Sequence, residues 1–217
     1  AYSGANVKII AVSGGVSYGA LGSTHHSLHD IALYRAIPNL AVVVPADYAQ
    51  TVTATRQLAD HEGPVYMRLG RGPVPDVYSD DGDSFRFGKA NVLKEGGECT
   101  LIAGGEALHH TLEAADLLNE AGVTTTVVDV PTIKPLDRET ILEATGGSRL
   151  VVTVEEHSVY GGLGGAVAEL LAQHNPVPMR IIGFPDEFLP AGNSGELFEH
   201  FGIEKRAIAQ RVLEALE

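Results

Sequence analysis

Three short apolar runs, rich in β-branched residues, occur in the first part of the chain. Each is bounded by glycine, proline or polar residues, which is typical of a strand buried in a sheet. The runs occupy residues 7–12, 41–44 and 65–69. The first ends at Gly14-Gly15, and the following loop stays rich in glycine through Gly22. We therefore expect three buried strands, the first of them followed by a tight turn.

Stretches with helical periodicity separate these runs. The apolar residues between positions 24 and 36 fall on one helical face, which predicts a helix that Ser23 or Thr24 caps. Asp47, with Gln50 in the capping-box position, predicts a second helix before the third run. Strands that alternate with helices of this length form parallel βαβ units, so the fold class is α/β. This first unit is shorter than an ordinary domain and corresponds to half of one.

A polar segment with prolines and aspartates but no apolar period, residues 72–87, marks a linker. Beyond it, Glu95–Glu98 predicts a hairpin turn, and Gly122 suits the left-handed position that ends a helix. Strands are expected at residues 99–103, 124–130, 150–155 and 179–183, and helices at residues 108–121, 138–145, 166–173 and 205–216. We divide the chain into a half-domain of residues 1–75, a linker of residues 76–87 and a complete parallel-sheet α/β domain of residues 88–217.

Charge is distributed unevenly along the 217 residues, whose 15 Lys and Arg and 28 Asp and Glu give a net charge of −13. Residues 1–75 carry five basic and four acidic residues, which leaves ten basic and twenty-four acidic residues for the remainder. The acidic part argues against nucleic acid and anionic membrane as partners, whereas the neutral part can receive a small anion. No apolar run approaches the roughly 20 residues that span a bilayer, and we expect a cytoplasmic protein.

Cys99 is the only cysteine of the sequence, so no internal disulfide can form. Its neighbours Thr100, Leu101 and Ile102 are those of a buried strand, and no activating residue lies nearby in sequence. We expect a buried thiol and not a catalytic one.

The densest polar cluster runs from Ser23 to Asp30 and contains three histidines. Three interpretations are open. His25 and His29 are spaced i, i+4, as two zinc ligands on one helix face would be, although no glutamate follows His25 as in the zinc-protease motif. Free N–H groups and imidazoles at a helix start can instead bind a phosphate or an oxyanion. Finally, Thr24 can simply cap the helix and leave the histidines solvated.

Two arginines lie near the end of the third predicted strand: Arg68 within it and Arg71 three residues later. Ligands of open parallel sheets lie beyond the carboxyl ends of the strands, and the guanidinium fork of arginine suits phosphate. Either arginine can also form a surface ion pair with one of the many carboxylates. Arg71, which glycines flank on both sides, is the stronger candidate for binding phosphate.

The glycine-rich segment Gly161–Gly165 is similar to a phosphate-binding loop but lacks the Gly-Lys-Ser/Thr ending. Close packing of a strand against the following helix is therefore the expected role of these glycines. Glu155, Glu156 and His157 precede the segment at a strand end, and we interpret them as residues that fix a loop or an interface.

Several motifs follow one another in a set order along nearly the whole chain. They are YGALGSTHH (18–26), DIA (30–32), RAIPNL (35–40), VPAD (44–47), GPVYMRLGRGP (63–73), KPLD (134–137) and EEHSVYGGLG (155–164). Taken in this order they resemble the transketolase family, the first five matching the second half of its pyrimidine-binding domain and the last two its C-terminal domain. The resemblance implies an incomplete thiamine diphosphate-binding (pyrimidine) domain and a complete transketolase C-terminal domain.

Members of this family transfer a ketol unit to an aldose acceptor through the thiazolium carbon of thiamine diphosphate. The resemblance implies that His25 is a catalytic residue near the reacting centre and that Arg71 binds the phosphate of a sugar phosphate. It places the diphosphate, its magnesium ion and the glutamate that protonates the aminopyrimidine outside this chain. The chain is then a fragment, a protein shortened at its start, or a subunit that needs an N-terminal transketolase partner in a homodimer or heterotetramer.

The sequence departs from the family at several site positions. Ala20, Leu21 and Gly22 stand where members usually carry Glu-Asp-Gly, whose aspartate holds a hydroxyl of the donor sugar. Ser13 stands where a histidine is often found, and His26 where glutamine is usual. Because a leucine side chain cannot hydrogen-bond a hydroxyl, we expect an unusual substrate that Ser13 or His26 helps to bind.

The resemblance predicts a transketolase-like transferase of sugar phosphates. A β-type subunit of a 2-oxoacid dehydrogenase and a deoxyxylulose-phosphate synthase share this domain order and are alternatives. A non-catalytic dimerisation scaffold is an alternative of another class, and a zinc hydrolase built on the histidine cluster is the third.

Overall fold

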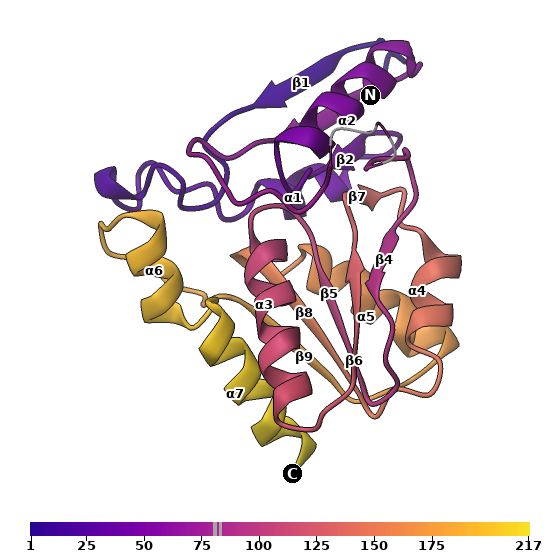
Figure 1. The fold of residues 1–217 in the computed structure, drawn as a ribbon. Coiled ribbons are helices and arrows are strands. Elements are labelled where there is room, and N and C mark those ends of the chain that lie inside the picture. Colours follow the sequence, from indigo (N-terminus) through magenta and orange to yellow (C-terminus); the bar gives the residue numbers. More distant parts are fainter. Residues whose placement is uncertain (80–81, 83) are drawn as a thin grey trace.

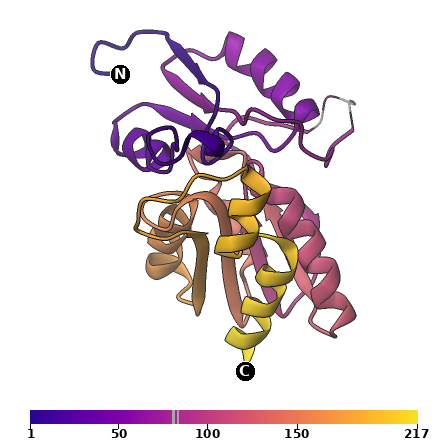
Figure 2. The same cartoon turned by 90° about the vertical axis from the view of Figure 1, so that its left-hand side faces the viewer.

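Two β-sheets and the helices around them make up the described part of the chain (Figure 1). The computed structural model describes residues 1–79, 82 and 84–217. Asp80, Asp81 and Asp83, which belong to the predicted linker, lie outside the described residues. The two chain ends lie at opposite ends of the molecule in both views (Figures 1 and 2).

The first sheet has the strand order β1-β3-β2-β7. Its first three strands are parallel, as the sequence predicts, whereas β7 runs antiparallel to β2 and comes from the far side of the linker. The strands are β1 (Lys8–Ala11), β2 (Ala41–Val43), β3 (Val65–Arg68) and β7 (Thr132–Lys134), and the helices beside them are the 3₁₀ turn η1 (Gly19–Leu21), α1 (Asp30–Ala36) and α2 (Tyr48–Asp60). Strand β7, which the sequence does not predict, ties the first sheet to the later part of the chain.

The second sheet has the order β4-β6-β5-β8-β9, and all of its pairs are parallel except β4 with β6. Its strands are β4 (Asn91–Lys94), β5 (Cys99–Ala103), β6 (Thr125–Asp129), β8 (Leu150–Ser158) and β9 (Met179–Phe184). The helices are α3 (Ala107–Glu120), α4 (Arg138–Ala144), α5 (Leu163–His174), α6 (Ser194–Phe201) and α7 (Lys205–Leu216). Within the residues described, no helix is both long and apolar enough to cross a membrane.

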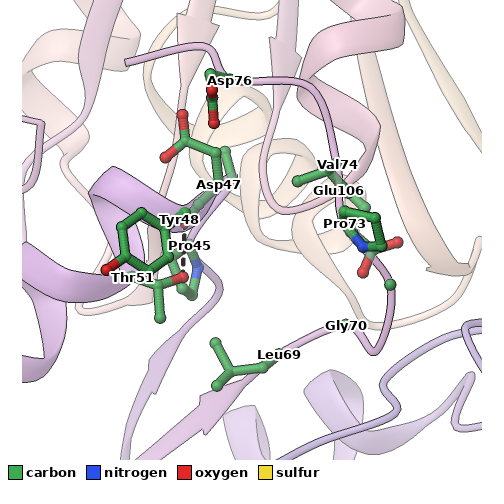
Figure 3. Close-up of a pocket in the computed structure, with 12 residues that line it drawn as sticks. Pro45, Asp47, Tyr48, Thr51, Leu69, Gly70, Pro73, Val74, Asp76 and Glu106 are labelled. Carbon is green, nitrogen blue, oxygen red and sulfur yellow. Dashed lines mark hydrogen bonds between the residues drawn. The ribbon is translucent and has the colours of Figure 1, made fainter. Parts of the chain in front are cut away.

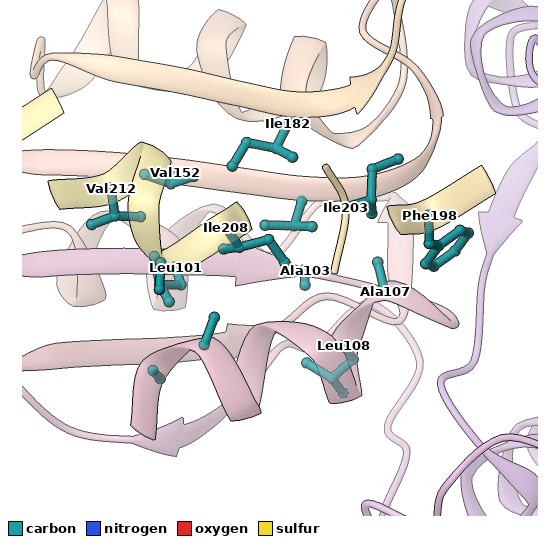
Figure 4. Packing of buried hydrophobic residues seen from close by; sticks show 14 of the residues in the cluster. Leu101, Ala103, Ala107, Leu108, Val152, Ile182, Phe198, Ile203, Ile208 and Val212 are labelled. Atoms are coloured by element: carbon teal, nitrogen blue, oxygen red, sulfur yellow. The ribbon is translucent and has the colours of Figure 1, made fainter. Parts of the chain in front are cut away.

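Helices cover both faces of the second sheet, which is why its central strands β5, β6 and β8 are buried at every position. Along β5, Leu101 and Ala103 pack with residues of α3, α6 and α7, whereas Ile102 between them packs on the other side with residues of α4 and α5. Successive side chains of a strand point to opposite faces, and a strand that is covered twice reads as a continuous apolar run. Figure 4 shows α3 and α7 side chains meeting over this sheet.

Local signals in the sequence predict several of the helix ends. Asp47 accepts a hydrogen bond from the Gln50 backbone N–H at the start of α2, and Asp137 accepts one from Thr140 at the start of α4. After α3, Gly122 adopts a φ of +87°, and the N–H of the next residue donates to the carbonyl of Leu118. These contacts lie within a few residues of each other, so the sequence alone specifies them.

The predicted hairpin around Glu95–Glu98 is wrong. Strand β4 does not pair with β5 but with β6, in antiparallel orientation. Both edges of β5 are occupied by parallel partners, β6 and β8, so the outer edge of β6 is the position left for β4. The turn connects two strands that β6 separates.

The prediction that β1 is buried is also wrong. Ile9 and Ile10 of this strand are 40% and 47% exposed, and Val12 beyond it is 68% exposed. In the sheet order β1 is the edge strand, with β3 on one side. The β-branched residues of β1 therefore favour a strand, but they are not buried by the described residues of the chain.

Helix α1 begins at Asp30, six residues after the predicted start at Thr24. Gly15 and Ser27 exchange backbone hydrogen bonds of 3.0 and 2.8 Å, which holds the segment before the helix against the turn after β1. A backbone engaged in this bridge cannot also be helical, so tertiary pairing overrides the helical periodicity of residues 24–29.

Helix α6 is absent from the sequence prediction, although a signal for it exists. Asn193 and Glu196 form a reciprocal capping box at its start, and Gly202 ends it in the left-handed conformation. Both are features that an amino-acid sequence displays.

The Cys99 thiol is fully buried in β5, as predicted, and burial raises its pKa to about 12. We expect the native protein at pH 8 to be inert toward a thiol-specific disulfide reagent, because neither access nor the thiolate is available. After unfolding in guanidinium chloride, one thiol per chain should react. Stoichiometric labelling of the native protein within seconds would contradict the buried position.

Candidate functional site

Two of the predicted site residues, His25 and Arg71, contact the same aromatic ring. The guanidinium carbon of Arg71 lies 3.8 Å from the centroid of the Tyr18 ring, over its face. The His25 ring meets Tyr18 edge-on, at 5.5 Å between centroids and 83° between planes. Arg71 and His25 are both exposed and Tyr18 is half-buried, so these three residues, the Tyr18 cluster, present a cation and an imidazole at the surface.

Backbone contacts between distant segments assemble this cluster. The turn after β1 is joined to the end of β3 by the hydrogen bond from the Gly14 N–H to the Leu69 carbonyl, 3.0 Å long. Ser23 in the loop before α1 donates its hydroxyl to the Leu189 carbonyl at 2.7 Å, which fixes that loop to the segment before α6. The sequence predicts His25 and Arg71 but not the tyrosine between them.

The other two predicted substrate-binding residues, Ser13 and His26, are not among the residues that contact the Tyr18 ring. Ser13 lies two residues after β1 and has a φ of 68°, an uncommon conformation for a residue other than glycine. The His26 ring lines a cavity of about 100 Å³ together with His29 and Phe188. Its Nε2 lies 3.4 Å from the Gly19 carbonyl, and its Nδ1 is buried and has no hydrogen-bond partner among the described residues.

The zinc interpretation of the histidine cluster loses its geometric basis. His25 and His29 precede α1 and therefore do not stand one turn apart on a helix face. Across residues 1–79, 82 and 84–217, no group of three His, Cys, Asp or Glu side chains is placed to hold a metal ion. The helix begins at the buried carboxylate of Asp30, which Tyr66 and Arg68 engage, and anion binding by this segment stays a prediction.

Arg68, the weaker of the two arginine candidates, is a buried structural residue. Its side chain is 4% exposed and pairs with Asp30 (Nε to Oδ2, 3.4 Å) and Glu156 (Nη2 to Oε2, 3.5 Å). Nη2 also donates to the Glu156 carbonyl at 2.7 Å, and the Tyr66 hydroxyl donates to Asp30 at 2.6 Å. Burial raises the pKa of Glu156, and the Arg68 guanidinium opposes this shift.

This buried ionic group supports the turn that leads to Tyr18. The Glu156 carboxylate accepts a hydrogen bond from the Val16 N–H at 2.8 Å. A Cβ on Gly14 would lie 2.1 Å from Arg68 Nε, and one on Gly15 would lie 2.2 Å from the Glu156 carboxyl carbon. The two glycines are therefore required by the close approach of the turn to the ion pair, a role that their position in sequence does not reveal.

In the glycine-rich segment at the start of α5, a carboxylate takes the place that a phosphate would need. Glu155 occupies the start of this helix, where its two carboxylate oxygens accept hydrogen bonds from the N–H groups of Leu163 (2.7 Å) and Gly164 (2.9 Å). Burial raises the pKa of Glu155 to about 7 in spite of these bonds. A Cβ on Gly162 would lie 2.0 Å from the same carboxylate, which confirms close packing and a loop-fixing role.

The structure also contains a cavity of about 530 Å³ that the sequence does not predict (Figure 3). It lies between the β2–α2 turn, the segment after β3 and the start of α3. Gly70 packs against the Glu106 carboxylate so closely that a Cβ on Gly70 would lie 1.2 Å from it. The lining residues are Pro45, Ala46, Asp47, Tyr48, Thr51, Leu69, Gly70, Gly72, Pro73, Val74, Asp76 and Glu106.

Comparison with models of protein families shows to which family the chain belongs. The model of the transketolase pyrimidine-binding domain matches residues 1–76, and that of the transketolase C-terminal domain matches residues 88–208. The chain belongs to the transketolase family. The α/β fold with two mainly parallel sheets and the family resemblance seen in the motifs are both confirmed.

Relatives within the transketolase family include separate subunits. The chain is 50% identical over 214 residues to an apulose-4-phosphate transketolase subunit of Phocaeicola vulgatus, covering 99% of this chain and 68% of that protein. It is 40% identical over 220 residues to a protein of Methanocaldococcus jannaschii described as "Putative transketolase C-terminal section", covering all of this chain and 68% of that protein. The chain therefore spans about two thirds of the length of these relatives.

Solved transketolase structures share the fold. One described as "Split gene transketolase, inactive beta4 tetramer" has a TM-score of 0.90 at 43% identity, covering 99% of this chain and 68% of its own. A transketolase mutant from Pichia stipitis has a TM-score of 0.76 at 20% identity over 99% of this chain and 30% of its own, which is a likeness of fold alone.

Transketolases depend on thiamine diphosphate, and the described residues of this chain do not match the ligands that the magnesium ion of its diphosphate requires. A magnesium ion that bridges phosphates requires a set of oxygen ligands. The Tyr18 cluster offers an arginine, an imidazole and a phenol, and the described residues hold no metal-binding group of His, Cys, Asp or Glu. None of the residues described is assigned to the magnesium ion.

Proposed function

We propose that this chain is the C-terminal subunit of a split, thiamine diphosphate-dependent transketolase that transfers a ketol unit between sugar phosphates. The observation that carries the proposal is the Tyr18 cluster, which joins His25 and Arg71 at one exposed surface. These are the two residues that the motifs of the family mark for the reacting centre and for phosphate. The names of the relatives that are separate transketolase subunits support it.

His25 has the chemistry for a catalytic role in this reaction. Its Nδ1 lies 3.0 Å from the Thr24 hydroxyl, so the ring is held while Nε2 is the nitrogen left for a substrate. An imidazole there can donate a hydrogen bond to a developing oxyanion or pass a proton to it. Thiamine diphosphate, when bound, supplies the thiazolium carbon at which the carbon–carbon bond is cleaved and formed.

Arg71 is proposed to bind the anionic end of the substrate, and Ser13 and His26 to contribute to substrate binding nearby. Leu21, in the 3₁₀ turn beside the cluster, is 49% exposed. A leucine at this place offers no hydrogen bond to a donor hydroxyl, which is consistent with a substrate other than the ordinary ketose phosphates.

A partner subunit is part of the proposal. The N-terminal transketolase subunit would hold the diphosphate and magnesium, in a homodimer or heterotetramer of the complete enzyme. The solved relative described as an inactive tetramer of a split-gene transketolase supports the inference that this chain alone is inactive. The cytoplasmic location and the division into residues 1–75, 76–87 and 88–217 stay predictions.

One enzymatic rival has a specific observation in its favour. The chain is 35% identical over 207 residues to a 1-deoxy-D-xylulose-5-phosphate synthase of Caldanaerobacter subterraneus, although it covers only 33% of that protein. Such an enzyme would use pyruvate as donor. The relatives that are separate subunits, of which the chain covers a larger share, favour the transketolase.

The test is reconstitution with the N-terminal partner subunit. Calorimetry should show thiamine diphosphate binding to the mixture with magnesium, and ketol transfer should appear with ketose phosphates. Turnover of pyruvate instead would favour the synthase, and absence of both binding and turnover would favour the non-catalytic scaffold. The isolated chain serves as the control and should have no activity.

A further inference from the structure

Arg71 is held by an aromatic ring and not by a carboxylate. In the part of the chain that the structure describes, its interaction is with the face of Tyr18, and no ion pair joins it to an acidic side chain. This is unexpected in a protein with 28 acidic and 15 basic residues, where Arg35 and Arg149 do pair with carboxylates. The side chain of Arg71 is also exposed, so a solute can reach it.

The way an arginine is held decides what it can still bind. A carboxylate partner occupies the N–H fork and neutralises the charge, which leaves little for a second anion. An aromatic face attracts the cation through its π-electrons and takes none of the five N–H donors. The Tyr18 ring therefore fixes the Arg71 guanidinium and keeps its fork free for an incoming anion.

The backbone that carries the ring has a fixed position. The Ser17 N–H donates to the Gly14 carbonyl at 3.2 Å, which closes the turn before Tyr18. On the other side, Gly19 is packed so tightly that a Cβ would lie 2.4 Å from the Gly192 carbonyl oxygen. The backbone of Tyr18 is thus placed by contacts on both sides of it in the chain, and these contacts do not involve Arg71.

We propose that Tyr18 is a positioning residue, which holds Arg71 in the orientation in which it binds the phosphate of a sugar phosphate. The proposal rests on the proposed function, since it assigns a second residue to the same phosphate site. A pre-oriented arginine loses less conformational freedom on binding than a free one, and the gain is confined to substrates that carry the anion.

The experiment compares Tyr18→Leu and Tyr18→Phe in the enzyme reconstituted with its partner subunit. Loss of a cation–π contact at an exposed site corresponds to about a three- to fivefold effect, so Tyr18→Leu should raise KM for a phosphorylated substrate by this factor. Tyr18→Phe keeps the ring and should restore the affinity. Tyr2→Leu, a fully exposed tyrosine outside the cluster, is the matched control.

Two further comparisons separate positioning from general damage. With an unphosphorylated substrate, Tyr18→Leu should leave KM unchanged, and in an Arg71→Ala background it should add nothing. An equal rise in KM for both substrates, or an undiminished effect without Arg71, would overturn the proposal.

A binding measurement keeps the proposal testable if the reconstituted enzyme does not transfer ketol units. Titration of this chain with inorganic phosphate, followed by the NMR signal of Arg71 Nε–H, should show weaker binding in Tyr18→Leu than in the native protein. Absence of turnover together with this difference would refute the proposed function but support the role of Tyr18. Equal phosphate binding by the two proteins would refute the role of Tyr18.

Discussion

Replacing Arg71 with alanine is expected to raise KM for a phosphorylated substrate by roughly 10- to 100-fold in the reconstituted enzyme, with a smaller change in kcat. Charge-assisted, bidentate hydrogen bonds to a phosphate contribute about 1.5–3 kcal/mol, and all of this is lost with the guanidinium. The phosphate is remote from the bond that reacts, so the loss appears mainly as affinity. Steady-state kinetics with phosphorylated and unphosphorylated forms of one substrate measure it.

Two further variants make the Arg71 experiment specific. Arg71→Lys keeps the charge but not the fork, and its KM should lie between those of the native enzyme and Arg71→Ala. Arg206→Ala removes an exposed arginine from α7, which no hydrogen bond, ion pair or ring contact among the described residues joins to the Tyr18 cluster, and should behave as native. Unchanged kinetics of Arg71→Ala with phosphorylated substrates would refute the assignment of Arg71.

The second large effect is on stability. Arg68→Met should lower the free energy of unfolding by about 3–5 kcal/mol, because it leaves the carboxylates of Asp30 and Glu156 buried without their cation. Equilibrium unfolding in urea measures the change as a lower midpoint at an unaltered slope. Activity should fall with it, since the turn that carries Tyr18 rests on Glu156.

A surface ion pair provides the control for Arg68. Arg149 pairs with Glu98 but is 61% exposed, so Arg149→Ala should cost no more than about 1 kcal/mol. A second comparison tests the cause: adding Asp30→Asn and Glu156→Gln to Arg68→Met removes the unpaired charges and should recover part of the loss. An unfolding midpoint of Arg68→Met equal to that of the native protein would show that the buried pair contributes nothing.

The helix ends and the chemistry of Cys99 could be predicted because they depend on neighbours in sequence. Asp47, Asp137 and Gly122 act on backbone groups within about one turn, and the apolar run around Cys99 is the mark of a doubly covered strand. The start of α1 could not be predicted, because a backbone bridge between Gly15 and Ser27 competes with the helix. The two segments that form this bridge meet only in the folded protein.

The pairing of the strands also could not be predicted from neighbours in sequence. The sequence indicates β4 and β5 as neighbours along the chain, yet their partners are chosen by which edges of the sheet remain free. Strand β7 is three residues long and joins a sheet whose other strands all precede the linker. Nothing local marks such a strand, because its stability comes from the edge of β2 that it covers.

For the candidate site, the sequence by itself determined the family through the order of its motifs. The family in turn made His25 and Arg71 candidate site residues. Only the tertiary structure decided what surrounds them. It separated Arg68, which is buried with Asp30 and Glu156, from Arg71, which is exposed on Tyr18, although the two arginines are three positions apart. The physical reason is that the charge environment of a side chain is set by segments as distant as residues 68 and 156, and these are brought together only by the packing of the two sheets.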